Sequence, residues 1–405
     1  ASRSPQASLF SGVFNLSSTI LGASALSMPH AAKDIGALLY VVMLVVIGFL
    51  SENSLFMLSE CTIFSGKSSF YGVGKAAMGN TGRMLAIAVV LLQQLGACCA
   101  YIKIIGDILA PIVSGIHNST LGSEAFWQVM LAALVCFPLC MLPRIDSLKY
   151  SSLTAVALVV VFVLMLVADG FDRVHDGLPS SQPVTVISSS VSDVFNSVPV
   201  STFAFVCHMN VFPVLAELKN PTRKRIRTVT TGSVAVCFFV YVAAGVMGYL
   251  AFLDCTDPDV IKSYQAIHAT LGVKQLAIPH TVVKVVQLGI GMALVFTYPV
   301  LAFELRHSAD ELMFPGRPFS WVRHTLENVA LVAVSCIVAI EVKSVTTVFG
   351  YTGATMSCMV VFVLPALFYS KLAPPNSSKR QLLLARVQFV IGIILIPLCL
   401  TVLIL

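Results

Sequence analysis

The chain has 405 residues, of which 57% are hydrophobic and only 11% charged, and its formal net charge at pH 7 is +6. Average globular proteins use about 25% charged residues, and long unbroken apolar stretches on a water-facing surface would aggregate. The composition therefore excludes an ordinary soluble protein and indicates a membrane protein.

Eleven apolar stretches, separated by short polar loops, account for most of the chain. A helix needs about 20 mostly apolar residues to cross the hydrocarbon core of a bilayer. The predicted spans are 9–30, 36–58, 84–113, 125–142, 151–169, 193–216, 228–252, 279–303, 325–340, 345–370 and 384–405. The pattern predicts an all-α polytopic membrane protein in which residues 1–405 form a single transmembrane domain.

Basic residues are distributed unevenly between the two sets of loops. If the N-terminus is cytoplasmic, the loops on that side hold eighteen of the 25 Lys and Arg residues. Cytoplasmic loops carry such an excess, so we expect a cytoplasmic N-terminus and an outer or lumenal Leu405. We interpret the basic cluster at 219–227 as a topology anchor that contacts lipid headgroups, rather than as a nucleic-acid site. The sequon at Asn118 then falls in an outward loop and is a predicted glycosylation site.

Two predicted spans contain residues that interrupt a helix. The first holds Asn15, a run of small residues from Gly22 and a proline at Pro29, and the sixth holds Pro199 and Pro213 among polar groups. Backbone groups freed by Gly and Pro must find partners in protein or in a wet cavity. Serine back-bonding and tight packing of small residues would explain one such helix. Because two such helices occur, five spans apart, we interpret both interruptions as functional.

Five is an odd number, so a second set of five spans begins from the opposite side of the membrane. This arithmetic predicts an inverted repeat, with a first repeat at about 9–169, a second at about 193–370 and an extra helix at about 384–405. Interrupted helices in matching positions of two inverted halves indicate a substrate site near the midplane of a secondary transporter. Free N–H groups suit a carboxylate and free carbonyls suit a cation, as a zwitterionic amino acid requires.

Four blocks of sequence carry a family resemblance. They are GVFNLSSTILGASALSMPHA in the first span, AYIKIIGDIL in the third, FAFVCHMNVFPVLAELKNPTRKRI in the sixth and Thr297-Tyr298-Pro299 in the eighth. In order and over essentially the whole chain, they resemble the amino acid/auxin permease family, which includes sodium-coupled neutral amino acid transporters and vacuolar amino acid transporters. The resemblance implies a leucine-transporter-type 5+5 fold and transport of amino acids by alternating access.

The resemblance also implies a set of substrate-binding residues. They are Gly22, Ala23, Ser24 and Ala25 in the first span, facing Thr202, Phe203, Phe205 and Cys207 in the sixth. The small residues agree with this role, because backbone N–H groups without bulky side chains can approach a ligand closely. The sequence does not decide whether Phe203 and Phe205 form walls of the pocket or face the lipid.

The coupling ion has two sets of candidates. In the sodium-coupled branch of the family, a first-span asparagine and the eighth-span threonine are associated with the cation. Thr297 keeps the threonine, whereas Ser18 stands at the asparagine position and Asn15 lies one turn earlier.

Coupling of transport to a proton requires a titratable group within the membrane. The candidates are Glu52, His208 and the Lys103–Asp107 pair. Lys103 and Asp107 are spaced i, i+4 and can equally neutralise each other. The sequence leaves sodium, proton and no coupling open, and we favour proton coupling or exchange.

No unpaired acidic residue stands beside either break in the sequence, so we predict small neutral amino acids as substrates. We expect a monomer surrounded by lipid, with no catalytic residues, cofactor or metal site beyond Na⁺ or H⁺ as coupling ion. No HExxH, GxSxG or phosphate-loop motif occurs, and the eleven cysteines show no metal-ligand spacing. The pattern leaves the plasma membrane and a vacuolar or lysosomal membrane open.

The alternative from another class is an amino acid sensor, a transporter fold that binds its substrate and signals to a partner. Such proteins usually add a long cytoplasmic segment, and about eight residues precede the first predicted span here. We therefore favour the carrier.

Overall fold

The computed structural model describes residues 7–114, 123–141, 149–177, 184–269 and 278–405. Throughout this described part the regular elements are helices, and the one extended pairing joins Ala7 to Leu218. Eight helices are long and apolar enough to cross a membrane, and a bent pair at Leu9–Ile20 and Ala23–Ile35 is a ninth candidate. The predicted all-helical membrane architecture is confirmed at this level.

The described chain has eight long helices, and seven of them match predicted spans as single helices, straight or with one local kink. They are α3 (Ala37–Ser65), α4 (Phe70–Ser114), α7 (Lys149–His175), α10 (Arg223–Phe252), α12 (His280–Met313), α13 (Trp321–Glu341) and α16 (Lys379–Ile404). The eighth consists of α14 (Val345–Thr352) and α15 (Leu364–Leu372), joined by π-helical stretches.

The other predicted spans are shorter or broken. The 125–142 region forms α5 (Glu124–Leu131) and α6 (Phe137–Cys140), joined by a π-helical stretch into one short apolar helix. The first span consists of α1 (Leu9–Ile20), a 3₁₀ turn at Ala23–Ser27 and α2 (Met28–Ile35), which meets α1 at 52°. The sixth consists of α8 (Val191–Ala204) and α9 (Val211–Glu217). The chain is thus interrupted at both places that the sequence indicated.

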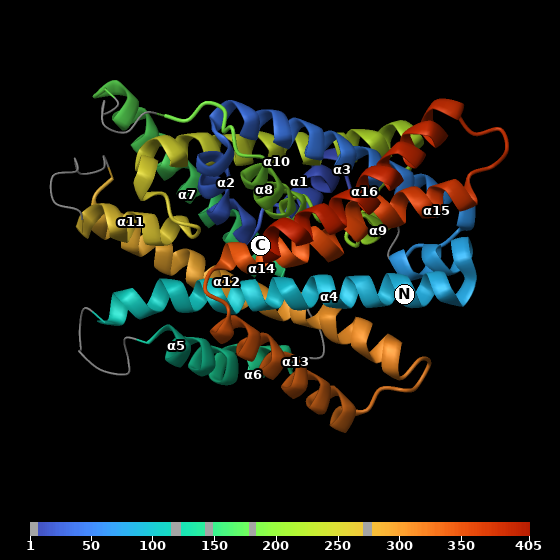
Figure 1. Ribbon diagram of the computed structural model, residues 1–405. Helices are drawn as coiled ribbons and strands as arrows, with labels where there is room; N and C mark the ends of the chain where they lie inside the picture. Colours follow the sequence, from blue (N-terminus) through green and yellow to red (C-terminus); the bar gives the residue numbers. More distant parts are fainter. Residues whose placement is uncertain (1–6, 115–122, 142–148, 178–183, 270–277) are drawn as a thin grey trace.

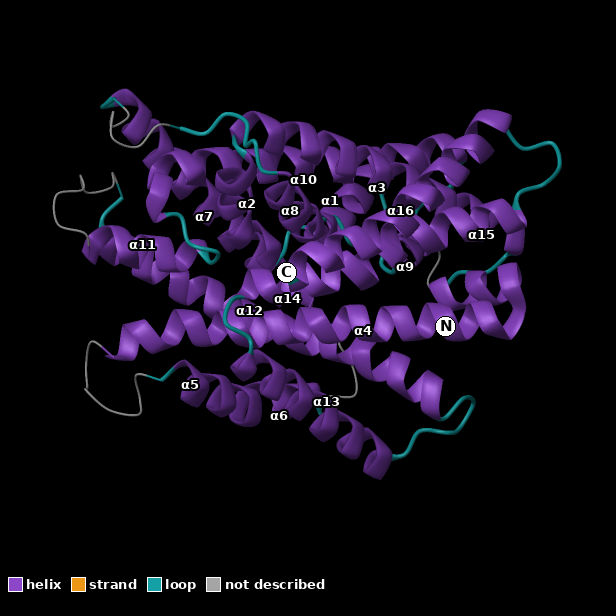
Figure 2. Ribbon diagram, in the orientation of Figure 1, coloured by secondary structure: helices purple, strands orange, loops and turns teal. Residues whose placement is uncertain are grey.

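The broken helices lie inside the bundle. In Figure 1, α4 and α12 cross each other along much of their length, with α5, α6 and α13 on one side of this pair. On the other side, α10 packs against α1, α2, α3 and α7, and α8 packs against α2 and α14 (Figure 2). The interrupted segments are therefore enclosed by protein, where their free backbone groups can find partners.

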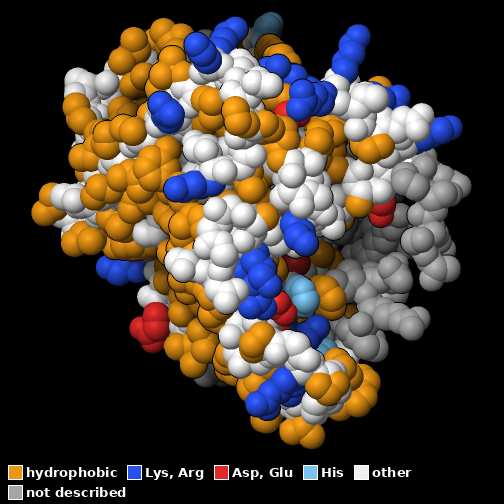
Figure 3. Space-filling model, turned by 90° about the vertical axis from the view of Figure 1, so that its right-hand side faces the viewer, with side chains coloured by type: hydrophobic (Ala, Val, Ile, Leu, Met, Phe, Trp, Pro, Cys, Tyr) orange, Lys and Arg blue, Asp and Glu red, His pale blue; other side chains and the backbone are white. Residues whose placement is uncertain are grey.

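One end of the bundle carries most of the exposed basic side chains. The connections from α3 to α4, α9 to α10, α12 to α13 and α15 to α16 all lie at the right of Figure 1. Exposed Lys and Arg residues on these connections and on the adjoining helix ends include Lys67, Lys75, Lys219, Arg223, Lys224, Arg227, Arg317, Lys371, Lys379 and Arg380. Figure 3 looks onto this end and shows their charge spread over it. We call it the basic end.

A turn near the start of α4 shapes the basic end. Met78 and Gly79 depart from helical geometry, and Gly79 has φ +65°, a conformation that a residue without Cβ adopts readily. Residues 70–78 therefore fold back as a short helix beside the start of the long segment of α4.

Close packing between α8 and the π-helical stretch after α14 yields a stability prediction. A Cβ added at Gly353 would lie 3.0 Å from Pro199 Cα and would overlap the Pro199 carbonyl group, and backbone cannot move aside as a side chain can. We expect Gly353→Ala to lower the melting temperature of the purified protein, since overpacking costs about 1–3 kcal/mol.

Gly350→Ala is the matched control. Its added Cβ would approach only the flexible end of Leu403, at 3.2 Å, so we expect a small change. Equal melting temperatures for the two variants would contradict the close approach between the backbone at Gly353 and the backbone at Pro199 of α8.

Candidate functional site

The first break leaves backbone N–H groups without partners in their own helix. The chain unwinds at Leu21 and Gly22, and the first hydrogen bond of the following 3₁₀ turn is donated by the Ala25 N–H to Gly22 O at 3.3 Å. The amides of Ala23 and Ser24 precede that bond, so they have no partner within the turn. The Tyr101 hydroxyl lies within reach of the Ala23 N–H, and a bound carboxylate can take its place as acceptor there while also accepting from the Ser24 N–H.

The second break spans residues 205–210 and is held by local turns. The Phe205 N–H donates to Thr202 O at 3.2 Å, and the Asn210 N–H donates to Cys207 O at 2.9 Å. Helix α9 then begins at Val211.

One side chain of α10 joins the two breaks. The hydroxyl oxygen of Tyr241 lies 2.7 Å from Ile20 O and 3.0 Å from Ala204 O, the last residues of α1 and α8, and 3.1 Å from Ser24 Oγ. A phenol donates one hydrogen and accepts others, so the two carbonyls share its proton while Ser24 donates to it. Tyr241 is fully buried, and its hydroxyl satisfies helix-end groups that both interruptions expose.

Further contacts fix this arrangement. Tyr40 of α3 donates to Tyr241 O at 2.8 Å, and Ser51 donates to Phe205 O at 3.3 Å. The Phe205 ring meets the Tyr241 ring edge-on at 5.4 Å. At the basic end, Ala7 pairs with the end of α9 through its N–H to Glu217 O at 2.9 Å. The two broken helices are therefore tied together at the middle and at one end.

A cavity lies between the breaks. It has two parts, of about 180 and 80 Å³, and we call them together the central cavity. Both parts are lined by Thr19, Gly22, Tyr101, Asn210 and Leu301. The walls thus come from α1 and its break, from α4, from the second break and from α12.

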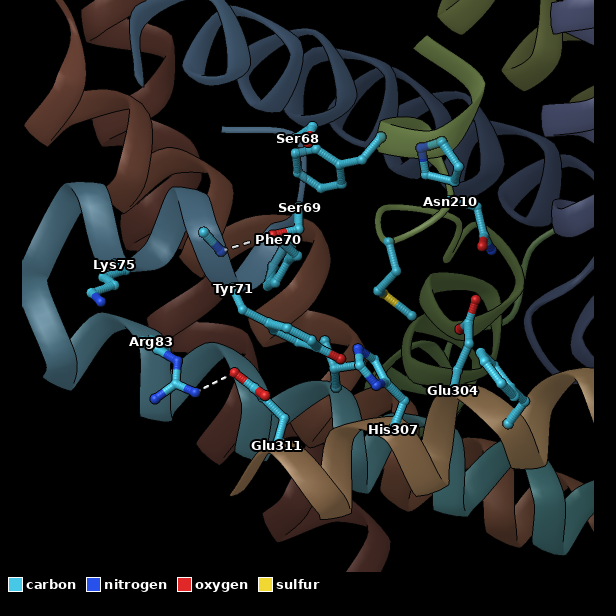
Figure 4. Close-up of a pocket in the computed structure, with 16 residues that line it drawn as sticks. Ser68, Ser69, Phe70, Tyr71, Lys75, Arg83, Asn210, Glu304, His307 and Glu311 are labelled. Atoms are coloured by element: carbon cyan, nitrogen blue, oxygen red, sulfur yellow. Dashed lines mark hydrogen bonds and ion pairs between the residues drawn. The ribbon is translucent and has the colours of Figure 1, made fainter. Parts of the chain in front are cut away.

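The central cavity leads to the basic end. A larger hollow of about 510 Å³, which we call the vestibule, is lined by Tyr71, Lys75, Arg83, His307 and Glu311, among others (Figure 4). Asn210 lines the vestibule and both parts of the central cavity, and Glu304 lines the vestibule and the larger part. The vestibule and the central cavity are therefore adjacent, on the side of the basic end.

Ion pairs join the helices at the opposite end. Lys103 Nζ lies 2.9 Å from Asp107 and 2.7 Å from Glu124 of α5, and Lys262 Nζ lies 3.1 Å from each of these carboxylates. Lys262 belongs to α11 (Val260–Ala269), outside the long helices. Burial disfavours its charge, but Asp107 and Glu124 outweigh this and hold the pKa of Lys262 above its ordinary value. The cluster links α4, α5 and α11 beyond the central cavity.

The structure brings together half of the predicted substrate residues. Gly22, Ala23, Ser24 and Phe203 line the central cavity. The Phe203 ring packs on Phe349 at 4.5 Å.

The other four predicted residues are buried elsewhere. Ala25, Phe205 and Cys207 are at most 1% exposed and do not line the cavity, and Thr202 donates its hydroxyl back to Val198 O at 2.8 Å. Phe205 therefore faces neither the cavity nor lipid, a third outcome that the sequence analysis did not consider.

The predicted ion residues separate into two groups. Ser18 and Thr297 both line the larger part of the central cavity, and each donates its hydroxyl to its own helix, to Asn15 O at 2.7 Å and to Ala293 O at 2.8 Å. The Asn15 side chain is not among the residues that line this cavity.

Glu52 and His208 lie apart from the central cavity. Glu52 accepts from Thr231 at 2.9 Å and lies 3.7 Å from Arg227 near the basic end. His208 is fully buried, with Nε2 2.5 Å from Ser54 Oγ. Lys103 and Asp107 pair with each other, the alternative to a proton site that their spacing allowed. Asn118 lies outside the described residues.

The sequence analysis missed several residues that line the cavity, above all Glu304. Gln93, Gln94, Tyr101 and Asn210 were not identified either. Glu304 follows the predicted end of the eighth span at 303, where charged residues resemble a loop, but α12 continues to Met313. The spacing of Thr297, Leu301 and Glu304 on one helical face is the signal that could have found it. The argument for neutral substrates assumed that no unpaired acidic residue lies near the breaks. This assumption is wrong for the folded protein, because Glu304 lines the cavity between them.

The fold and the site define a class. Apolar helices enclose two facing interrupted helices, and the cavity between these helices is reached from one end, as in a helical membrane transporter that holds its solute at the centre of the bundle. The chain belongs to the family of transmembrane amino acid transporter proteins, whose model matches residues 5–405.

Curated relatives agree with this assignment. The chain is 27% identical over 398 residues to the sodium-coupled neutral amino acid symporter 2 of Danio rerio, covering 92% of this chain and 77% of the relative. It is 29% identical over 384 residues to the amino acid transporter AVT6E of Arabidopsis thaliana, covering 91% and 77%.

A solved structure shares the fold. MhsT, crystallised in complex with L-phenylalanine, superposes with a TM-score of 0.62 at 13% identity, over 99% of this chain and 100% of the other. The expected family membership is confirmed, and the chain shares the fold of MhsT.

The bridging role of Tyr241 predicts a loss of stability on removal of one oxygen. Tyr241→Phe leaves two buried helix-end carbonyls without a donor, which costs about 1–3 kcal/mol. We expect a lower melting temperature in detergent. Tyr351→Phe is the control, because the Tyr351 hydroxyl donates to Leu403 O at 3.2 Å from a side chain that is 42% exposed. A Tyr241→Phe protein as stable as Tyr351→Phe would contradict the bridge.

Proposed function

We propose that the protein is a secondary active transporter that moves small neutral amino acids across a membrane by alternating access, coupled to a proton or sodium ion or operating by exchange. The observation that carries this proposal is the central cavity between the two breaks, which leads into the vestibule at the basic end. The printed names of the relatives, an amino acid symporter and an amino acid transporter, support the substrate class.

The free backbone donors at the first break define how the substrate is held. Its α-carboxylate is received by the amides of Ala23 and Ser24, and its side chain lies toward Phe203 and Val206. Among the described residues that line the central cavity there is no Lys, Arg or His to receive an anionic side chain. Glu304 is capped by the Gln94 amide, which is compatible with a neutral substrate.

The topology belongs to the same proposal. The protein has eleven spans as a 5+5 inverted repeat, residues 9–169 and 193–370, with α16 as the extra helix. By the positive-inside rule the N-terminus and the basic end are cytoplasmic, so the vestibule faces the cytoplasm and the Lys103–Lys262 cluster faces the outer or lumenal side. The carrier acts as a monomer in a plasma membrane or a vacuolar or lysosomal membrane.

Flux measurements test the proposal. Purified protein in liposomes is given a panel of labelled amino acids with and without imposed sodium and proton gradients. We expect saturable uptake of small neutral amino acids that exceeds uptake of anionic ones. Tight binding without flux would instead indicate the sensor, and absence of both would contradict the assignment of the cavity.

Gly22 gives a site-specific prediction. Its φ of −125° suits any residue, and an added Cβ would meet Tyr101 Oη at 3.3 Å, so valine leaves the fold intact but fills the cavity. We expect Gly22→Val to weaken substrate binding about tenfold or more, and Gly22→Ala to have a smaller effect. Equilibrium binding of labelled amino acid checks this, with melting temperature as the folding control. Unchanged affinity in Gly22→Val would place the substrate elsewhere.

A further inference from the structure

Among the described residues that line the central cavity, Glu304 is the one that carries a carboxylate. It lies on α12 one turn beyond Leu301 and two turns beyond Thr297, so all three face the same side. Figure 4 shows its carboxylate directed into the hollow toward Asn210 of the second break. The side chain is accessible from the vestibule as well as from the cavity, because it lines both.

No salt bridge joins Glu304 within the described chain, unlike most carboxylates of the neighbouring helices. Asp107 lies against two lysines, Glu311 is paired with Arg83, and Glu60 lies 2.8 Å from Arg223. Glu304 instead accepts a hydrogen bond from the side-chain amide of Gln94 on α4. Its charge is therefore not neutralised by a fixed protein cation.

Gln94 is a partner for either protonation state. Its amide nitrogen donates to a carboxylate, and after rotation of the amide its oxygen accepts from a carboxylic acid. An arginine or lysine would favour only the ionised form. The pair is therefore suited to binding and releasing a proton, whereas an amide donor directed at the carboxylate is unfavourable for a metal cation, which is bound by several oxygens.

The groups around Glu304 allow its carboxylate to bind and release a proton. On α4, Tyr71 bonds Ser308 at 2.5 Å, Tyr101 lines the cavity, Lys75 lines the vestibule and Arg83 is held by Glu311. On α12, His307 lines the vestibule, and Arg306 lies 4.0 Å from Glu327 of α13. The second break contributes Asn210, and α7 contributes apolar Ala155, Val156 and Val159. Arg83 and Arg306 are thus paired with other carboxylates, and neither Lys75 nor His307 forms a salt bridge with Glu304 in the described chain.

We propose that Glu304 is the proton-binding residue of this carrier: its carboxylate takes up one proton when substrate binds, and releases it with the substrate through the vestibule. The inference rests on the proposed function, since it names the ion that moves with the amino acid. It differs from the candidates identified in the sequence, because Glu52 and His208 do not line the central cavity.

Proteoliposomes containing wild type and Glu304→Gln test this with three readouts: amino acid exchange without a gradient, accumulation driven by a pH difference at clamped membrane potential, and acidification reported by a trapped pH dye. With one proton per substrate, a one-unit pH difference supports about tenfold accumulation in wild type. We expect Glu304→Gln to exchange amino acids but to show neither accumulation nor proton movement. Glu60→Gln on α3, whose carboxylate is paired with Arg223 at 2.8 Å and lines neither the vestibule nor the central cavity, is the matched control and keeps both.

The outcomes separate this inference from the proposed function. Proton-driven accumulation that persists in Glu304→Gln would overturn the role of Glu304, as would a wild type that exchanges amino acids without moving protons or that accumulates them only in a sodium gradient. A wild type without any amino acid flux would overturn the proposed function itself. If Glu304→Gln also loses exchange, Glu304→Asp decides: exchange with proton movement supports the assignment, and exchange without it refutes it.

Discussion

The hydrogen bonds of the Tyr241 hydroxyl are the contact on which the site depends. A helix that stops inside a membrane protein exposes carbonyls that cannot remain unpaired. Tyr241 lies within hydrogen-bond distance of such a carbonyl in each broken helix, Ile20 O and Ala204 O, and of the Ser24 hydroxyl. The same interaction therefore allows both helices to be broken and holds their breaks opposite each other, so that the cavity forms between them.

Charge is arranged differently at the two ends of this cavity. Toward the outer or lumenal side of the proposed topology, Lys103, Asp107, Glu124 and Lys262 neutralise one another and bind α11 to the bundle. Toward the basic end, the vestibule remains open and contains Glu304, a carboxylate with an amide partner. Fixed ion pairs stabilise a closed side, while a carboxylate without a cation can change its charge during transport. In the proposed alternating-access cycle, this arrangement corresponds to a state in which Glu304 is reached from the basic end.

Most of the predicted spans and both interruptions are found in the structure because these features are local: a 20-residue apolar run and a Gly or Pro within it can be recognised without knowledge of packing. The site residues depended on more. Once the helix is broken at 205–210, helical periodicity no longer tells which of Phe203, Phe205 and Cys207 faces the cavity, and only Phe203 does. Glu304 was missed because polar residues after 303 resembled a loop, although α12 continues. Its proximity to Gln94 arises from the packing of α12 against α4, which no local pattern encodes.

The most direct test is an experimental structure of the purified protein with a bound small neutral amino acid. The account predicts ligand density between the backbone of Gly22–Ser24 and the side chain of Phe203, with the ligand carboxylate at the Ala23 and Ser24 amides. Continuous helices through residues 20–23 and 204–211, or a ligand bound outside the space between them, would contradict it.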